Sequence, residues 1–311
     1  MRTAAGSTSP RARRGGGAGR PPPARETDVR QPPTERPDPL PTHLTTPDGT
    51  RIAYRDHHPP SPAVPAPPPV LLLHGLAGHQ GEWDDLAGRL LADGHRVVTY
   101  DARAHGDSTR RPAATTRAAH VQDAVALIDH LSLAPAVLIG QSLGGHTALL
   151  LAAAHPGLVA SLVLVEAGPG GPDPELPARI ENWLDRWPTP FASLESAREF
   201  LGHEAWARGL ERRADGWHPR FDRDKILACV AEPAATSYWP QWSRIPHPTL
   251  LVRGDRGTVD DDQTTEMLLR RPQTHHTLIP DAGHDVHLDQ PARLHEAVAG
   301  FLRTWSTADT R

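Results

Sequence analysis

The chain has 311 residues, enough for one large domain or two modest ones, and a formal net charge of −4 at pH 7. This nearly balanced charge gives no reason to expect a nucleic-acid partner, and no run approaches the roughly twenty apolar residues that cross a membrane. The single cysteine, Cys229, excludes an internal disulfide and is typical of a reducing compartment, so we expect a cytoplasmic protein.

The first forty residues differ from the rest. Residues 1–40 are rich in Gly, Pro and Arg and have few large apolar side chains. Such a segment buries too little surface to offset the entropy lost on ordering, so we expect a disordered leader. No apolar stretch follows the arginines, which argues against a secretory or twin-arginine signal.

From residue 41 the pattern becomes globular, and apolar runs alternate with amphipathic segments. Strands are predicted at RIAYRD (51–56), VLLLHG (70–75), RVVTY (96–100), AVLIG (136–140), LVLVE (162–166), TLLVRGD (249–255) and HHTLIP (275–280). Helices are predicted at residues 83–94, 120–133, 143–156, 260–271 and 291–305. The alternation predicts an α/β fold: a doubly wound, mostly parallel sheet formed by residues 41–167 and 249–306, with helices on both faces.

An interruption at residues 168–248 separates the two parts of the predicted sheet. Its segments are amphipathic and helical, without an evident strand, and six of the eight tryptophans lie in it: Trp183, Trp187, Trp206, Trp217, Trp239 and Trp242. We expect a helical cap over the C-terminal edge of the sheet, where ligands bind in such folds. Each tryptophan either joins the cap to the core or lines an apolar pocket.

A serine lies between glycines where one predicted strand meets a helix. The segment Gly140-Gln141-Ser142-Leu143-Gly144 follows the strand AVLIG directly. The G-x-S-x-G pattern in this setting predicts a sharp turn that exposes the serine hydroxyl at a helix N-terminus. A serine held there and paired with a base is a nucleophile for acyl transfer. The alternative interpretation is that Ser142 only caps the N-terminus of the helix and that the flanking glycines are incidental.

The predicted base is His284, in the loop PDAGHDVHLDQP between the last strand and the last helix. In a parallel sheet this loop lies at the same edge as Ser142. His287 is the alternative base, and a metal pair of the two histidines lacks an evident third ligand. The oxyanion that forms on the substrate needs two backbone donors, and we expect the N–H groups of Leu143 and Leu76.

Several motifs in this order resemble the α/β-hydrolase superfamily, in particular its members with a helical cap. They are HGLAG (74–78), DARAHGDS (101–108), GQSLGG (140–145), LVLVEAGP (162–169) and PDAGHDVHLDQP (280–291), and the resemblance covers roughly residues 43–305. One departure is Ala104, where the family usually has glycine. The resemblance implies that this turn is scaffold, although His105 within it is placed to line the pocket.

The family's usual acid follows the strand TLLVRG, and that position is Gly257 here, which has no carboxylate. Asp255 is close by, whereas Asp260 and its neighbours are typical of an acidic helix N-terminus. Other members carry the acid at the end of the preceding core strand, where this chain has Glu166. We favour Glu166 over Asp255, with a structural carboxylate as the alternative role for Glu166.

The resemblance and the residues together predict a serine hydrolase that cleaves a carboxylic ester, lactone or similar acyl bond through an acyl-enzyme. The tryptophans favour a small apolar or aromatic acyl substrate. No cofactor or metal is expected, because no phosphate-binding glycine loop is evident. The same triad also serves perhydrolases and C–C bond hydrolases, and a non-catalytic small-molecule receptor is the alternative from another class.

Overall fold

An eight-stranded sheet organises the chain. The computed structural model describes residues 42–61 and 65–306, so the predicted leader, residues 1–40, lies outside the described residues. The strands of the sheet are β1 (Thr42–Thr45), β2 (Arg51–His57), β3 (Val70–Leu73), β4 (Val97–Tyr100), β5 (Ala136–Gln141), β6 (Val159–Val165), β9 (Thr249–Gly254) and β10 (His275–Ile279). Their order across the sheet is β1-β2-β4-β3-β5-β6-β9-β10.

The pairing of these strands confirms the predicted sheet. Only β2 is antiparallel to its neighbours β1 and β4, and every ladder from β4 to β10 is parallel. Each predicted strand is present within a few residues of its expected bounds. Strand β1 was not predicted, because THLT is too short to carry a clear alternation of apolar and polar residues.

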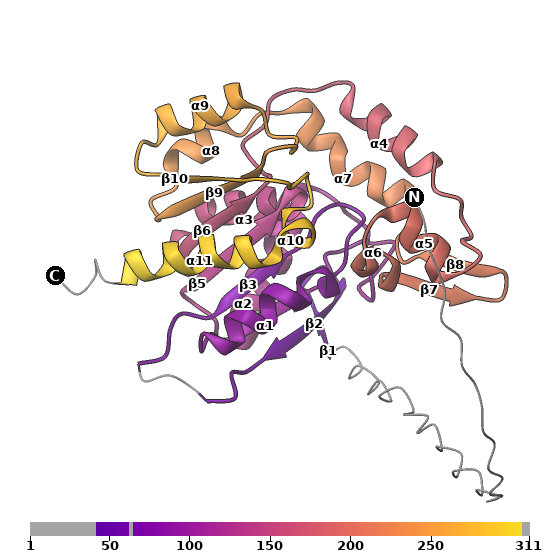
Figure 1. Cartoon of the computed structure of the whole chain (residues 1–311), viewed down its shortest axis with the longest axis horizontal. Helices are drawn as coiled ribbons and strands as arrows, with labels where there is room; N and C mark the ends of the chain where they lie inside the picture. The colour runs from indigo at the N-terminus through magenta and orange to yellow at the C-terminus, as the bar shows by residue number, and fades with distance from the viewer. Residues whose placement is uncertain (1–41, 62–64, 307–311) are drawn as a thin grey trace, which may run out of the picture. The chain divides into compact units, whose positions relative to one another are not determined.

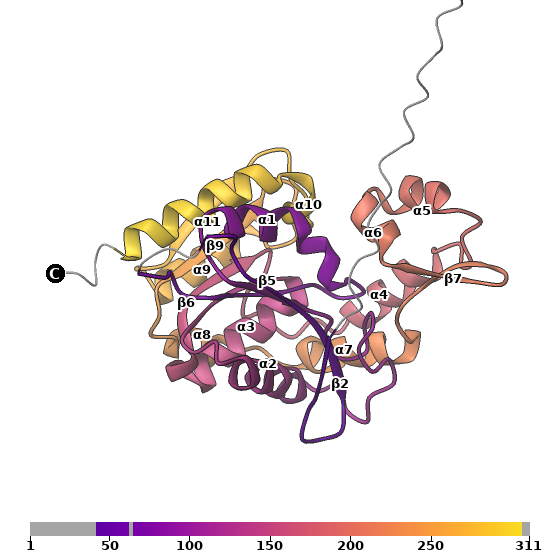
Figure 2. The same ribbon diagram turned by 90° about the horizontal axis from the view of Figure 1, so that it is seen from below.

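Helices pack on both faces of the sheet. They are α1 (Asp84–Ala92), α2 (Arg117–Leu131), α3 (Ser142–Ala154), α4 (Leu176–Asp185), α5 (Leu194–Leu201), α6 (Glu204–Arg208), α7 (Arg223–Ala235), α8 (Trp239–Arg244), α9 (Asp261–Arg270), α10 (Val286–Asp289) and α11 (Pro291–Ser306), with 3-10 turns η1 (Gln80–Trp83) and η2 (Pro156–Leu158). Helices α1 and α11 cover one face and α2, α3 and α8 cover the other (Figure 1), and Figure 2 shows the two layers from below. No described helix combines the length and apolar character that a membrane span needs.

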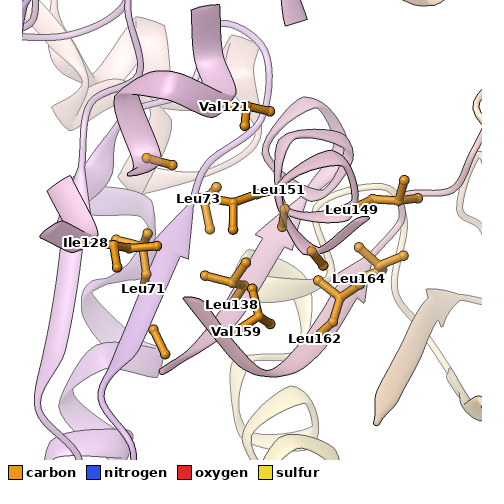
Figure 3. Packing of buried hydrophobic residues seen from close by; sticks show 14 of the residues in the cluster. Leu71, Leu73, Val121, Ile128, Leu138, Leu149, Leu151, Val159, Leu162 and Leu164 are labelled. Atoms are coloured by element: carbon orange, nitrogen blue, oxygen red, sulfur yellow. The ribbon is translucent and has the colours of Figure 1, made fainter. Parts of the chain in front are cut away.

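The core lies on both sides of β3. Leu71 and Leu73 pack into one cluster with side chains of α2 and α3, part of which Figure 3 shows. Val70 and Leu72 point to the opposite face and pack against α1 and α11. Because both faces of a central parallel strand are buried, its sequence is a continuous apolar run rather than an alternating one.

The segment between β6 and β9 corrects one expectation. It holds the helices α4 to α8, but it also holds a hairpin of β7 (Leu210–Arg213) and β8 (Gly216–Pro219), so the prediction that it has no strand was wrong. Ala214 and Asp215 form the turn, and Gly216, the first residue of β8, has a φ of +147°, which favours glycine. The Asp-Gly pair was the available signal for this hairpin.

The end of this segment packs against the sheet domain itself. Trp242 of α8 is fully buried in the same cluster as Leu71 and Leu73, and its Nε1–H donates to the carbonyl of Met267 at 3.0 Å. All the described residues fall in one compact unit. The limits of residues 168–248 as a separate cap therefore stay a prediction.

Candidate active site

A cavity of about 820 Å³ opens at the carboxyl ends of the central strands. Such an edge is where open α/β sheets bind ligands. All five residues predicted for the favoured site line this cavity: Leu76, Ser142, Leu143, Glu166 and His284. Asp255, the alternative acid, is not among its lining residues.

The serine lies at a strained turn between β5 and α3. Strand β5 ends at Gln141 and the helix begins at Ser142, whose φ of +49° is in the left-handed region. That conformation costs a residue with a side chain about 1–2 kcal/mol. A Cβ on Gly144 would overlap the carbonyl of Leu73, so only glycine lets the first turn of α3 approach β3 so closely. The hydroxyl is thereby placed at a helix N-terminus, which favours negative charge.

The turn that carries Leu76 is anchored by two buried histidines. His74 donates from Nδ1 to the carbonyl of Gly75 at 2.7 Å, and His105 accepts at Nε2 from the N–H of Ala77 at 3.0 Å. Burial lowers the pKa of His105 to about 3, so its ring is neutral at pH 7 and stays an acceptor. His105 is fully buried and does not line the cavity, contrary to the expectation that it faces the pocket.

The predicted base follows β10 in a loop of the same edge. The side chain of His284 is 37% exposed, and its Nδ1 lies 2.9 Å from Oγ1 of Thr258 and 3.5 Å from Oε2 of Glu166. His284 and Ser142 line the same cavity. A hydrogen bond between Oγ of Ser142 and Nε2 of His284 stays a prediction.

The Glu166 carboxylate is buried and surrounded by donors. The residue is 2% exposed, and it accepts backbone N–H groups from Gly254 at 2.9 Å, Thr258 at 2.6 Å and Val259 at 3.2 Å. Burial alone would raise its pKa, but the hydrogen bonds from His284 and these three amides outweigh burial and lower it. Glu166 is therefore ionised at pH 7 and can orient and stabilise a charged imidazole.

Gly257 explains why the acid belongs to another strand. A Cβ at Gly257 would overlap the Glu166 carboxylate, which occupies the space of a side chain at the family's usual acid position. Asp255 is 37% exposed at its side chain and accepts the N–H of Ala282 at 3.1 Å. The structure thus brings Glu166, and not Asp255, to His284, although the catalytic role of either acid stays a prediction.

Sequence reasoning missed several groups of this site. Thr258 places its hydroxyl between Glu166 and His284, and nothing in the sequence separates it from other threonines except its place after β9. A second carboxyl–imidazole pair, Glu82 of η1 and His287 of α10, has Oε2 and Nε2 3.4 Å apart. Burial raises the pKa of Glu82 to about 8 and lowers that of His287 to about 4, so both are neutral at pH 7.

The tryptophans divide between the two roles left open by the sequence. Trp183, Trp206 and Trp239 line the cavity together with apolar side chains of α4 and α7. Trp187 and Trp242 are buried in packing clusters instead. The cavity therefore has an apolar, aromatic wall in addition to the serine elbow.

The sheet order and the serine elbow are those of an α/β hydrolase. A family model described as "alpha/beta hydrolase fold" matches residues 68–291, and the chain belongs to this family. This confirms the resemblance that the sequence motifs predicted.

Two of the relatives carry names that assign them to ester hydrolysis. The chain is 32% identical over 266 residues to the sn-1-specific diacylglycerol lipase ABHD11 of Mus musculus, which covers 76% of this chain and 81% of the relative. It is 25% identical over 252 residues to Esterase YbfF of Escherichia coli, covering 75% of this chain and 92% of the relative. Family and relatives together support hydrolysis of an ester bond in general.

Solved structures agree on the fold. E-2-(Acetamidomethylene)succinate hydrolase superposes with a TM-score of 0.75 at 21% identity, over 85% of this chain and 99% of that chain. At this identity the likeness supports the fold alone.

Proposed function

We propose that this protein is a serine hydrolase that cleaves a carboxylic ester, a lactone or a similar acyl bond, with Ser142 as nucleophile, His284 as base and Glu166 as acid. The observation that carries the proposal is the strained Ser142 elbow on the same cavity as a His284 ring that lies 3.5 Å from an ionised, buried carboxylate. An ionised carboxylate in the interior needs hydrogen-bond donors or a cationic partner, and the imidazolium that forms during the reaction would be such a partner.

The first half of the reaction forms the acyl-enzyme. Nε2 of His284 takes the proton of Ser142 while Oγ attacks the substrate carbonyl carbon, and the carbonyl oxygen becomes an oxyanion. The N–H groups of Leu76 and Leu143 donate to this oxyanion, and each such donor contributes about 2.7–4 kcal/mol to the transition state. The intermediate collapses, the ester C–O bond breaks, and His284 gives its proton to the leaving alkoxide.

Water completes the cycle by the same steps in reverse roles. His284 takes a proton from water, the hydroxide attacks the acyl carbon, and the proton passes to Oγ of Ser142 as the acid leaves. In both halves Glu166 faces the imidazolium that forms. Its three backbone donors fix the carboxylate, so little reorganisation is needed when the charge appears.

The aromatic wall supports a small apolar or aromatic acyl substrate. Trp183, Trp206 and Trp239 bring large apolar surfaces to the cavity. Burying an acyl chain or ring against such surfaces yields roughly 25 cal/mol per Å² of apolar area removed from water. Affinity for small apolar or aromatic acyl groups larger than acetyl should therefore exceed affinity for acetyl esters.

Hydrolysis of a substrate panel by the purified protein tests the proposal. The panel holds esters, lactones, thioesters and β-diketones, and it is run with the wild type, Ser142→Ala and the control Ser243→Ala on the exposed surface of α8. We expect turnover of esters or lactones in the wild type and the control but not in Ser142→Ala. Turnover of diketones alone would favour a C–C bond hydrolase, and no turnover by any protein would favour a receptor.

A further inference from the structure

His146 lies one helical turn after the proposed nucleophile and faces the same cavity. It belongs to α3, four residues beyond Ser142, which corresponds to a rise of about 6 Å along the helix. The residue is 8% exposed and lines the cavity. Its ring meets the ring of Tyr238 edge to face, with the centroids 4.4 Å apart, so it is held on its other side.

A buried arginine fixes which ring nitrogen of His146 carries the proton. Nε of Arg117 lies 3.1 Å from Nδ1 of His146. A guanidinium donates hydrogen bonds and never accepts them, so Nδ1 must be the unprotonated acceptor. The proton of the neutral ring is therefore on Nε2. Burial first, and then the Arg117 charge, hold the pKa of His146 well below its usual value, so the ring is neutral at pH 7.

Arg117 is rigidly held. The residue is 1% exposed, and Nη2 donates to the carbonyl of Leu143 at 3.0 Å and to the hydroxyl of Thr147. The backbone N–H of Arg117 donates to Glu232 at 2.9 Å. An arginine anchored at this many points keeps the His146 tautomer constant.

The N–H on Nε2 of His146 has no protein acceptor among the described residues. Nε2 of His146 is not one of the fully buried polar atoms that lack a hydrogen-bond partner. Because His146 lines the cavity and Nε2 is not among the buried unpaired atoms, the cavity is taken as the space that this N–H group reaches. The chain therefore presents one neutral, fixed hydrogen-bond donor to the cavity that Ser142 also lines.

The charges around the cavity restrict which substrate groups can bind this donor. Among the described lining residues there is no lysine or arginine, whereas five carboxylates line it besides the neutral Glu82: Glu166, Asp173, Asp260, Asp262 and Asp285. A substrate with a second, negatively charged group would enter a field of like sign. The acceptor that fits is consequently an uncharged oxygen.

We propose that Nε2–H of His146 selects substrates that carry a neutral oxygen acceptor, an ether, ketone or hydroxyl oxygen, two to four bonds from the scissile carbonyl. The inference rests on the proposed function, because it names the substrate class of that same site. His146 is then a specificity-determining residue, and Arg117 is a positioning residue that acts through it. The donor adds to the apolar recognition by the tryptophans and does not replace it.

Matched pairs of esters test this selection. In the acyl series, p-nitrophenyl methoxyacetate is compared with the butyrate and 3-methoxypropionate with the pentanoate; in the alcohol series, 2-methoxyethyl butyrate is compared with butyl butyrate. The members of each pair differ by an oxygen in place of a methylene. The measured quantity is the ratio of kcat/KM for the oxygen ester to that for its alkyl partner, so intrinsic reactivity cancels when variants are compared.

Two substitutions separate the donor from the shape of the side chain. In His146→Leu the ratio should fall about 3- to 10-fold in at least one pair, the range expected for one neutral hydrogen bond. In His146→Gln the ratio should recover, because the amide oxygen can accept from Arg117 while the NH₂ group faces the cavity. An unchanged ratio in both variants for all pairs would overturn the inference. If the wild type hydrolyses neither these esters nor the esters, lactones and thioesters of the wider panel, the proposed function itself fails; turnover of lactones or thioesters alone would overturn the proposed ester preference.

A measurement on the wild type covers the case in which a variant does not fold. Long-range proton–nitrogen NMR correlations distinguish a protonated Nε2 from a protonated Nδ1. We expect His146 to show the Nε2–H tautomer without titration between about pH 5 and pH 8, the range in which ordinary histidines change charge. A proton on Nδ1, or a charged ring at pH 7, would contradict the assignment.

Discussion

Replacing Glu166 by glutamine removes a charge while keeping nearly the same shape, and the structure sets the size of the effect. Oε2 of Glu166 faces the N–H groups of Thr258 and Val259 as well as His284, whereas Oε1 faces the N–H of Gly254 alone. The amide oxygen of the introduced glutamine should therefore take the place of Oε2, because three donors point there. Its NH₂ group is then turned toward the N–H of Gly254.

Two consequences follow from this orientation. His284 keeps an acceptor and its tautomer but loses the negative charge that stabilises its cation. We therefore expect kcat to fall about 10²–10³-fold, or roughly 2.7–4.1 kcal/mol, less than the roughly 10⁴-fold loss seen when a triad histidine adopts the wrong tautomer. The opposed donors at Gly254 should cost about 1–3 kcal/mol of folding stability.

The assay is turnover of p-nitrophenyl acetate at saturating substrate, with circular dichroism confirming that each variant is folded at the assay temperature. Asp255→Asn is the matched control, since it removes a charge from the alternative acid, which bonds Ala282 and not His284. We expect the control to stay within about twofold of the wild-type kcat. A crippled Asp255→Asn beside an active Glu166→Gln would refute the assignment of the acid.

Three further changes probe the same arrangement. Gly257→Ala places a methyl group on the Glu166 carboxylate and should lower kcat by about tenfold or more, whereas Gly157→Ala, whose Cβ meets nothing within 4 Å, should leave kcat unchanged in the same assay. Because folding lowers the pKa of Glu166 below 4.5, its stabilisation is present above that pH and is lost as pH falls through the folded value. Urea unfolding should accordingly show the wild type's advantage over Glu166→Gln shrinking as the pH falls below about 4.5, and a constant gap would contradict the linkage. Trp183→Ala should raise KM for p-nitrophenyl phenylacetate by about tenfold with little change for the acetate, and equal changes would show that this ring does not contact the acyl group.

The parts of the fold that the sequence predicted are those encoded locally. A buried parallel strand such as β3 is a continuous apolar run, and the glycines on either side of Ser142 predict the turn there. Strand β1 and the hairpin β7–β8 were missed because four-residue strands carry too little periodicity, and in the hairpin the Asp-Gly signal stood among charged residues.

The site residues whose location follows from their position along the chain were predictable. The residues whose role depends on a partner far away in the sequence were not. The loop order of a parallel sheet was enough to place His284 and Ser142 on one edge. By contrast, the hydrogen bond between Arg117 and His146 joins two helices and residues that are 29 positions apart in the sequence. No local sequence pattern predicts it. The preference for Glu166 came from resemblance, and its physical reason, the space left by Gly257, is visible only in three dimensions.

Covalent labelling tests most directly whether the hydroxyl at the strained elbow is the reactive nucleophile. The full-length protein is treated with a fluorophosphonate, digested, and analysed by mass spectrometry, alongside Ser142→Ala and His284→Gln. We expect a single adduct on Ser142 in the wild type, none in Ser142→Ala, and much slower labelling in His284→Gln. Labelling of another residue, or labelling at Ser142 that is indifferent to the loss of the imidazole, would contradict this expectation.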